Sequence, residues 1–361
     1  MSFGGPLAGY LRRLLLAQVI GIAIALTALL QMLELLDVTT DILKRKLGVV
    51  GVLHYAALRL PTEFTLALPL AMLVGSLFTY YTLARNHELV AIRASGLRLR
   101  WVVGTLLPVA VGLAAIQFVV SDRVVPVTEA SLANWWAASE LPDEDDERKE
   151  SNRLWFRTQD GLTAVERTSS NGRMLQGVTI YLRDEQGQYA GRKTAREAQW
   201  SDRSWRLRDV SSLRLFDDHA ERAANAEENW QTNLRPSDLG QDSAQLPLSS
   251  TALLGVLAGR RVGDRPASYY RTVLYKAYLA PFTLAIMLLL ALPATRSVQR
   301  GGEGGGMLLL ALGTGLGFTL TVGLLGSLGQ GGRLLPFFAA IVPLLLFGGL
   351  GLSWLHRYDK L

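Results

Sequence analysis

The sequence has no cysteine and only four histidines among its 361 residues. Disulfides, thiolate metal sites and cysteine nucleophiles are therefore excluded. The histidines lie in different segments, and none has a second histidine at ligand spacing, so a zinc or di-iron centre has no support. The sequence contains neither the GxSxG nucleophile motif nor the GxxxxGK[ST] phosphate loop. We therefore expect a protein that is not an enzyme by itself and that holds no cofactor or metal.

Charged side chains are also absent from six long apolar runs. Each run has about the 20 residues that cross a ~30 Å hydrocarbon core at 1.5 Å per residue. A soluble core built from helix after helix of this length would be exceptional. The runs therefore predict six membrane-spanning helices in two groups of three: Leu14–Leu33, Phe64–Ala84, Trp101–Ser121, Ala277–Thr295, Met307–Leu328 and Leu334–Leu355.

The basic residues near these runs indicate their orientation. Most of them, such as Arg12, Arg93 and Arg296, flank the ends that share a side with both termini. An excess of lysine and arginine marks the cytoplasmic side of a membrane protein. We therefore expect a multi-pass membrane protein with cytoplasmic termini and a large insert that lies outside the cytoplasm. The main exception to the bias is the cluster Lys44–Lys46, which this topology places on the opposite side.

The polar insert, at about residues 125–265, alternates apolar and polar residues in short runs, which predicts antiparallel β-structure. The predicted fold is thus an α-helical membrane protein with six transmembrane helices (3+3) and an inserted all-β, jelly-roll-like periplasmic domain. Residues 1–124 would hold the first three helices and residues 266–361 the last three. The predicted strands are Leu154–Arg157, Thr163–Glu166, Val178–Leu182, Trp205–Leu207 and Leu213–Phe216.

An energy source for transport is not visible in the chain. The spans carry none of the buried charges that an ion-coupled carrier uses, which favours a separate ATPase on the cytoplasmic side. A short helix at about residues 85–97 suits that contact. Asn86 would cap it, Glu88 would lie in its first turn, and Ser95-Gly96 would end it. An ordinary amphipathic loop helix is the alternative.

Three segments carry a family resemblance. ARNHELVAIRASGLR, at Ala84–Arg98, closely resembles the coupling segment of the lipopolysaccharide-export permeases (LptF/LptG), nearer to their G-type than to their F-type members. WQTNLRPSDLG, at Trp230–Gly240, resembles the G-type pattern that ends the extracytoplasmic domain. YKAYLAPFTLAIMLLLALP, at Tyr275–Pro293, resembles the fourth span of the family. With the shared layout, the resemblance covers nearly the whole chain.

The resemblance implies a subunit of an ABC exporter that extracts lipopolysaccharide from the inner membrane. The partners would be a homologous permease (LptF), a dimeric cytoplasmic ATPase (LptB) and a periplasmic jelly-roll bridge (LptC and LptA), with no nucleic acid. The residues expected to couple to the ATPase are Arg85, Glu88, Arg93, Ser95 and Gly96. The alternatives are an F-type subunit, a permease for another lipid, or a non-transporting membrane scaffold with a periplasmic binding domain.

The basic cluster that opposes the positive-inside bias acquires a role from this resemblance. Lipid A carries phosphates at headgroup depth, where each nearby cation contributes roughly 1 kcal/mol. The expected ligands of these phosphates are Lys44, Arg45, Lys46 and Arg59. Interfacial anchoring by snorkelling cations is the alternative role.

The chain departs from the family at two positions. Family members tend to place lysines where this sequence has Glu34 and Thr62. Two explanations follow. Either the basic function has moved to Lys44–Lys46, or divalent cations bridge Glu34 and Asp37 to phosphate.

Overall fold

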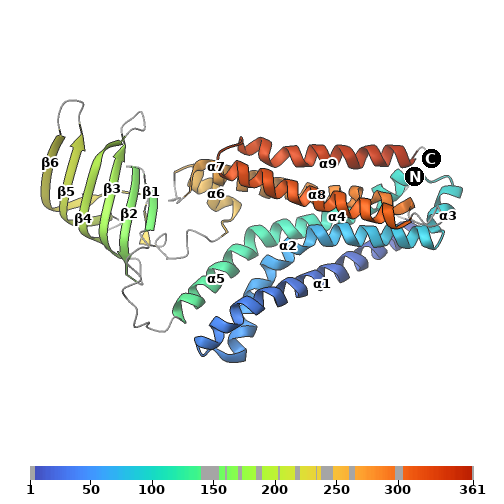
Figure 1. Ribbon diagram of the computed structural model, residues 1–361, viewed down its shortest axis with the longest axis horizontal. Helices are drawn as coiled ribbons and strands as arrows, with labels where there is room; N and C mark the ends of the chain where they lie inside the picture. Colours follow the sequence, from blue (N-terminus) through green and yellow to red (C-terminus); the bar gives the residue numbers. More distant parts are fainter. Residues whose placement is uncertain are drawn as a thin grey trace. The chain divides into compact units, whose positions relative to one another are not determined.

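Two compact units make up the chain in the computed structural model (Figure 1). The helical unit comprises Met1–Ser139 and Arg271–Leu361, and the β unit comprises Glu140–Tyr270. The structure describes residues 5–139, 154–158, 161–169, 173–183, 189–201, 204–215, 220–232, 234–236, 247–259, 265–296 and 304–359.

The helical unit is built from long apolar helices. Six helical stretches are long and apolar enough to cross a membrane: Pro6–Lys44, Gly48–Arg85, Leu99–Trp136, Ala267–Arg296, Gly305–Gln330 and Pro336–Asp359. The six predicted spans are thereby confirmed. The individual elements are α1 (Pro6–Lys44), α2 (Gly48–Arg85), α3 (Glu88–Ala94), α4 (Leu99–Val119), a π-helical turn η1 (Val120–Val124), α5 (Val125–Ala138), α7 (Ala267–Leu290), a 3₁₀ turn η4 (Leu292–Arg296), α8 (Gly304–Gln330) and α9 (Pro336–Asp359).

Several helices continue well past the predicted spans. Helices α1 and α2 form an antiparallel hairpin whose turn lies between Lys44 and Gly48 (Figure 1). That turn is eleven residues beyond the end of the first apolar run at Leu33, or about 16 Å farther along the helix axis at 1.5 Å per residue. The third helix likewise continues through η1 and α5 to Ala138. The apolar run therefore sets where a span lies, but not where its helix ends.

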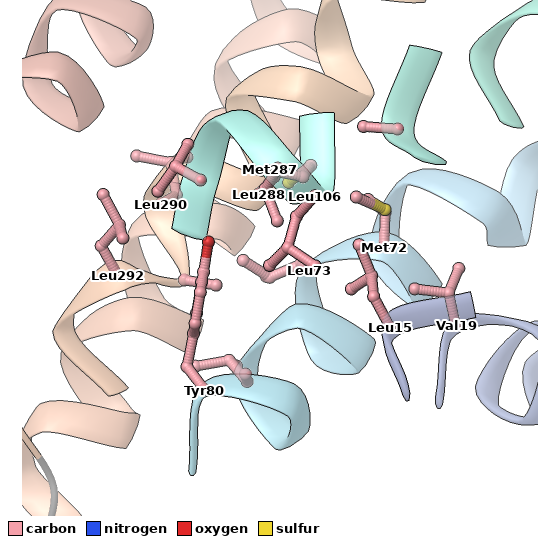
Figure 2. Packing of buried hydrophobic residues seen from close by; sticks show 14 of the residues in the cluster. Leu15, Val19, Met72, Leu73, Tyr80, Leu106, Met287, Leu288, Leu290 and Leu292 are labelled. Carbon is pink, nitrogen blue, oxygen red and sulfur yellow. The ribbon is translucent and has the colours of Figure 1, made fainter. Parts of the chain in front are cut away.

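A single apolar core joins the two groups of helices. Leu73 and Tyr80 of α2 and Leu106 of α4 are fully buried beside Met287 of α7 and Leu292 of η4 (Figure 2). Helix α2 is central to this core, because it packs against α1, α4, α5, α8 and η4. Burial of these side chains on several sides of one helix holds the two groups together.

Glycines set the closest approaches to α2. A Cβ added at Gly75 would lie 2.8 Å from Cα and 2.9 Å from the backbone nitrogen of Val19, so α1 and α2 touch backbone to backbone there. Gly315 of α8 leaves the space that the Leu73 side chain fills. Small residues of this kind let helices approach closely in a membrane, where van der Waals packing drives their association.

The β unit contains one antiparallel sheet with sequential neighbours. The order is β1-β2-β3-β4-β5-β6, and each strand pairs with the next one along the chain. The strands are β1 (Leu154–Thr158), β2 (Gly161–Thr168), β3 (Met174–Arg183), β4 (Tyr189–Ser201), β5 (Ser204–Leu215) and β6 (Ala220–Trp230), and a helix α6 (Ser250–Leu257) follows them. One face of the sheet carries the core, with Trp205 and Leu207 fully buried among its residues.

The Trp230–Gly240 motif contributes to this core. Trp230 and Leu234 are buried in it, and the indole nitrogen of Trp205 donates a hydrogen bond to the Leu234 carbonyl oxygen at 2.9 Å. A buried indole N–H needs such an acceptor. The segment after β6 therefore closes one side of the apolar face.

The predicted strands are correct in place but incomplete. The first three fall in β1, β2 and β3, whereas the runs at Trp205–Leu207 and Leu213–Phe216 belong to one strand, β5, and Phe216 lies outside the described residues. Strands β4 and β6 were not predicted. Strand β6 reads AERAANAEENW, which favours a helix by composition. Its pairing with β5 outweighs that propensity, because strand formation depends on neighbours more than on intrinsic preference.

The inserted β-structure is confirmed, but its jelly-roll detail is not. A jelly roll has two sheets joined by Greek-key crossovers. All six described strands belong to one sheet in which neighbours in space are neighbours in sequence. Strands β1 and β6 are the end strands of the described sheet, and each therefore has one paired neighbour.

Gly75→Ala should loosen the α1–α2 contact. The new Cβ would meet the Val19 backbone, which cannot rotate away, and overpacking of this kind costs about 1–3 kcal/mol. We expect the apparent melting temperature of the purified protein to fall by about 2–4 °C per kcal/mol. Gly112→Ala in α4 is the matched control, because a Cβ there has nothing within 4 Å. Equal melting temperatures for the two variants would contradict the close approach.

Candidate functional site

Helix α3 lies at the end of the helical unit that also holds the beginning of α1 and the end of α9 (Figure 1). Its Leu89 and Ile92 side chains are buried in the apolar core. The opposite side of the helix, with Val90, Ala91 and Ala94, is exposed. The short helix is therefore anchored by two apolar side chains and presents a small, mostly apolar outer surface.

The ends of α3 agree only in part with the prediction. Ser95 is the C-cap residue, and Gly96 follows with φ +84, the left-handed conformation that glycine favours after a helix. The predicted cap at Asn86 is wrong. Asn86 ends α2, and His87, with φ 57, precedes α3 without a side-chain capping bond. The Asn86 amide instead donates a hydrogen bond to Glu88 Oε1 at 3.3 Å.

Two hydrogen bonds connect α3 to distant parts of the chain. The Tyr10 hydroxyl of α1 donates to Glu88 Oε1 at 3.1 Å. Arg93 Nη2 donates to the carbonyl oxygen of Tyr358, in the last turn of α9, at 3.2 Å. Carbonyls of a last helical turn lack intrahelical donors, and a cation there also meets the negative end of the helix dipole. Arg93 is therefore turned toward α9 as well as toward the surface.

The end of α9 collects further contacts. The backbone N–H of Arg100 donates to Asp359 Oδ1 at 3.2 Å, and the Arg296 guanidinium lies 4.5 Å from the centre of the Tyr358 ring. Through these residues α3 is linked to α1, α4, α9 and η4. Of the five predicted coupling residues, Arg85, Ser95 and Gly96 are exposed, and Glu88 and Arg93 are half-buried. The sequence does not indicate which residues these side chains contact, because the contacted residues lie up to 265 positions away along the chain.

The cluster Lys44–Lys46 divides into two kinds of side chain. Lys44 and Lys46 are exposed at the tip of the α1–α2 hairpin, and Lys44 pairs with Asp41 at 3.2 Å. Arg45 points the other way. Its Nη1 donates to the Trp136 carbonyl oxygen at 2.7 Å, and its guanidinium lies 4.1 Å from the centre of the Trp136 ring. Arg45 therefore fastens the end of α5 to the hairpin.

Arg59 is neutralised inside the helical unit. Its Nε lies 2.6 Å from Glu34 Oε1 on α1, and its Nη1 lies 2.7 Å from Glu129 Oε1 on α5. Glu34 also accepts a hydrogen bond from the Tyr55 hydroxyl at 2.7 Å, and Glu129 accepts one from Thr62. The two positions that depart from the family pattern, Glu34 and Thr62, thus serve one ionic network with Arg59. Because Glu129 lies in the expected β insert, no sequence pattern pointed to it.

This network lies at the predicted outer ends of the first two spans. It joins α1, α2 and α5, whereas the exposed lysines lie farther out at the hairpin tip. Asp37 is exposed on the next turn of α1. Within the described part of the chain, no group of three or more histidine, aspartate or glutamate side chains is placed to hold a metal ion.

The two faces of the sheet differ in chemistry. On β3, Val178 and Ile180 point to the apolar core and are 1% and 2% exposed. Tyr181 lies on the opposite face, where its ring stacks on Trp155 with the ring centres 5.7 Å apart. The period-two pattern predicted for Val178–Leu182 is therefore present. An amphiphile that followed the sheet would meet hydrocarbon-like side chains on the Val178 face alone.

The chain is similar to known proteins over most of its length. The model of the family described as lipopolysaccharide export system permease LptF/LptG matches residues 9–357. The chain is 24% identical over 297 residues to the lipopolysaccharide export system permease protein LptG of Haemophilus influenzae, covering 81% of this chain and 82% of that protein. The protein of the same name from Escherichia coli (strain K12) is 24% identical over 242 residues, which is 66% of each chain.

Arg59→Gln should destabilise the helical unit, because Glu34 and Glu129 would lose their shared counter-charge. Removing one partner of a buried ion pair costs 3–5 kcal/mol, and partial exposure lowers this to about 1–3 kcal/mol here. The measurement is thermal unfolding in detergent, with Lys44→Gln, at an exposed pair, as the control that should change little. The additional change Glu129→Gln in the Arg59→Gln protein should recover part of the loss. An Arg59→Gln protein as stable as the control would disprove the network.

Proposed function

Because the chain belongs to the lipopolysaccharide export system permease family LptF/LptG, we propose that it is the G-type permease subunit of an ATP-driven exporter. In this role it extracts lipopolysaccharide from the inner membrane together with a homologous F-type permease (LptF). A dimeric cytoplasmic ATPase (LptB) supplies the energy, and a periplasmic bridge (LptC and LptA) accepts the lipid. The six apolar helices fit a multi-pass inner-membrane protein. The proposed orientation has cytoplasmic termini and a periplasmic β unit.

The observation that carries the ATPase contact is the construction of α3. A loop helix that only connects two spans needs no tie to distant elements. Here Leu89 and Ile92 enter the core, Glu88 meets α1 and Arg93 meets α9. A displacement of α3 by an ATPase would therefore be passed to both the first and the last span. A membrane scaffold has no use for such a link.

The β unit supplies the proposed route for the lipid. Its apolar face is lined by alternate residues of successive strands, including Val178, Ile180 and Leu207. Acyl chains that leave the membrane could stay in contact with such a surface. Strands β1 and β6 lie at opposite edges of the described sheet. Each has a neighbouring strand on one side only among the strands that the structure describes. An edge strand that pairs with a strand of a bridge protein would extend the sheet from one protein to the next.

The exposed cations at the hairpin tip keep their proposed role toward lipopolysaccharide phosphates. Lys44 and Lys46 are exposed to such a contact. Arg45 and Arg59 would act indirectly, as positioning residues, because both side chains bond to other parts of the helical unit. Their proposed contribution is to keep α5 and the hairpin in a fixed arrangement.

Glu88→Lys should weaken the productive contact with the ATPase. Reversing a charge on the α3 surface removes complementarity and introduces repulsion, so we expect a loss of roughly tenfold or more in ATP-driven lipopolysaccharide release. The measurement uses the purified permease pair reconstituted with the ATPase. Recovery of the protein from the membrane should be unchanged.

Tyr10→Phe is the matched control for this experiment. It removes the hydrogen bond to Glu88 but leaves the carboxylate on the α3 surface. If Glu88 acts on the ATPase, we expect Tyr10→Phe to lose less activity than Glu88→Lys, because it removes one hydrogen bond to α1 but leaves the docking carboxylate and the Arg93 contact with α9. Normal release by Glu88→Lys, or an equal loss in both variants, would be evidence against a docking role for Glu88.

Photo-crosslinkers along β3 test the lipid route. Residues Val178 and Ile180 should label lipopolysaccharide, and Thr179 and Tyr181 should not, because the latter point to the opposite face. The readout is the adduct formed during ATP-driven transport. Labelling at every position, or at none of them in an active complex, would rule out this face as the route.

A further inference from the structure

Of the half-buried cations that the structure describes in the helical unit, all but one have partners. Arg12 donates to the Thr105 carbonyl oxygen at 3.0 Å, and Arg45, Arg59, Arg93 and Arg296 have the partners described above. Lys276 of α7 is half-buried too. Among the residues that the structure describes, none accepts a hydrogen bond from its ammonium group or forms an ion pair with it.

The Lys276 ammonium lies on α8 close to the end of that helix. A Cβ added at Gly326 would be 2.8 Å from Lys276 Nζ, so the glycine leaves room for the amine. Helix α8 ends at Gln330, one turn beyond Gly326. The side chain is therefore near the boundary at which the apolar stretch ends, and this is the depth of lipid headgroups. Tyr275, the sequence neighbour of Lys276, contacts the half-exposed ring of Phe337 at the beginning of α9.

The surroundings of Lys276 are basic. Across residues 265–296 and 304–359 the single carboxylate side chain is Asp359, at the opposite end of α9. Arg271 and Arg333 add two exposed cations at the Lys276 end. In the first group of helices, the Asp122 carboxylate of η1 lies 3.4 Å from Nε of Arg123. The protein thus supplies no counter-ion for the amine among the residues described here.

An unpaired ammonium at this depth calls for an external anion. A lysine inside a membrane span costs about 2.5–3.5 kcal/mol on insertion scales, and residues of this kind mark binding sites by default. The ammonium has three donors and no acceptor. Because Lys276 lies in an apolar helix that is long enough to cross a membrane, an anion that belongs to an amphiphile is favoured. A headgroup phosphate combines both properties at the required depth.

We propose that Lys276, assisted by Arg271 and Arg333, binds the phosphate of an amphiphile at the junction of α7, α8 and α9. The inference names a substrate-binding residue within the proposed function and rests on it for the identity of the amphiphile as lipopolysaccharide. An anionic phospholipid carries the same chemistry. A carboxylate of a neighbouring membrane protein is a different occupant, and the apolar and headgroup surroundings disfavour it.

The test compares lipid binding by the full chain in nanodiscs of phosphatidylcholine. The variants are Lys276→Gln and Lys276→Arg, with Arg357→Gln, at an exposed position in the last turn of α9, as a control for loss of a basic charge. The probes are lipopolysaccharide, lipopolysaccharide stripped of its lipid A phosphates, and phosphatidylglycerol. Lys276→Gln should lower the affinity for phosphorylated lipopolysaccharide about fivefold, as expected for one cation near a charged surface. Lys276→Arg should keep most of the affinity, and the dephosphorylated probe should not distinguish the variants.

The outcomes separate the site from the proposed function. A Lys276→Gln protein that binds phosphorylated lipopolysaccharide and phosphatidylglycerol as the unchanged protein does would overturn the proposal. So would unchanged lipid binding combined with loss of assembly with the partner permease, which would assign the amine to a partner carboxylate. If the unchanged protein binds no lipopolysaccharide, the proposed function fails, and a fivefold drop for phosphatidylglycerol would still support the phosphate site. Lys276→Gln removes a charge from a span, so correct folding is expected and is checked by thermal unfolding.

Discussion

Hydrocarbon offers no hydrogen bonds, and every polar group that enters it must find a partner in the protein or in the lipid. This constraint accounts for the helical unit. Its apolar runs are uncharged over about 20 residues each, and some of the charges that flank them, such as Arg59 and Arg93, are bonded across helices. Arg59 joins three helices because Glu34 and Glu129 come from α1 and α5. Where the described residues supply no partner, as at Lys276, the same constraint favours the proposed ligand.

Close helix packing supplies the second requirement. In a membrane the helices gain little from leaving lipid for protein, so contact quality decides their arrangement. Gly75 admits the α1 backbone, and Gly315 admits Leu73. These contacts make α2 the shared element of both groups of helices. Helix α3 follows α2 directly, and it contacts α1 through Glu88 and α9 through Arg93. A movement of α3 would therefore be transmitted to these helices.

The β unit has a different requirement. Its sheet has one apolar face, which must be either covered by other residues or available to bind an apolar ligand. Trp230, the last residue of β6, and Leu234, which follows the strand, cover part of that face. A transporter that moves an amphiphile can use the remainder as a surface for acyl chains. The same alternation that stabilises the sheet would then guide the lipid, and the aromatic stack of Trp155 and Tyr181 on the opposite face would stay outside the route.

The sequence by itself determined the six spans, the inserted β-structure, the family resemblance and the place of α3. These depend on local periodicity, on length and on contiguous motifs, which neighbouring residues carry. Only the tertiary structure decided which cations are bound internally. Lys44 and Arg45 are adjacent in sequence, yet one is exposed and the other holds α5. The partners of Arg59 and Arg93 depend on contacts between distant helices, and strand β6 depends on its pairing with β5 against its own composition. Such contacts arise from packing and charge pairing between residues that are far apart in the sequence. No local sequence pattern indicates them.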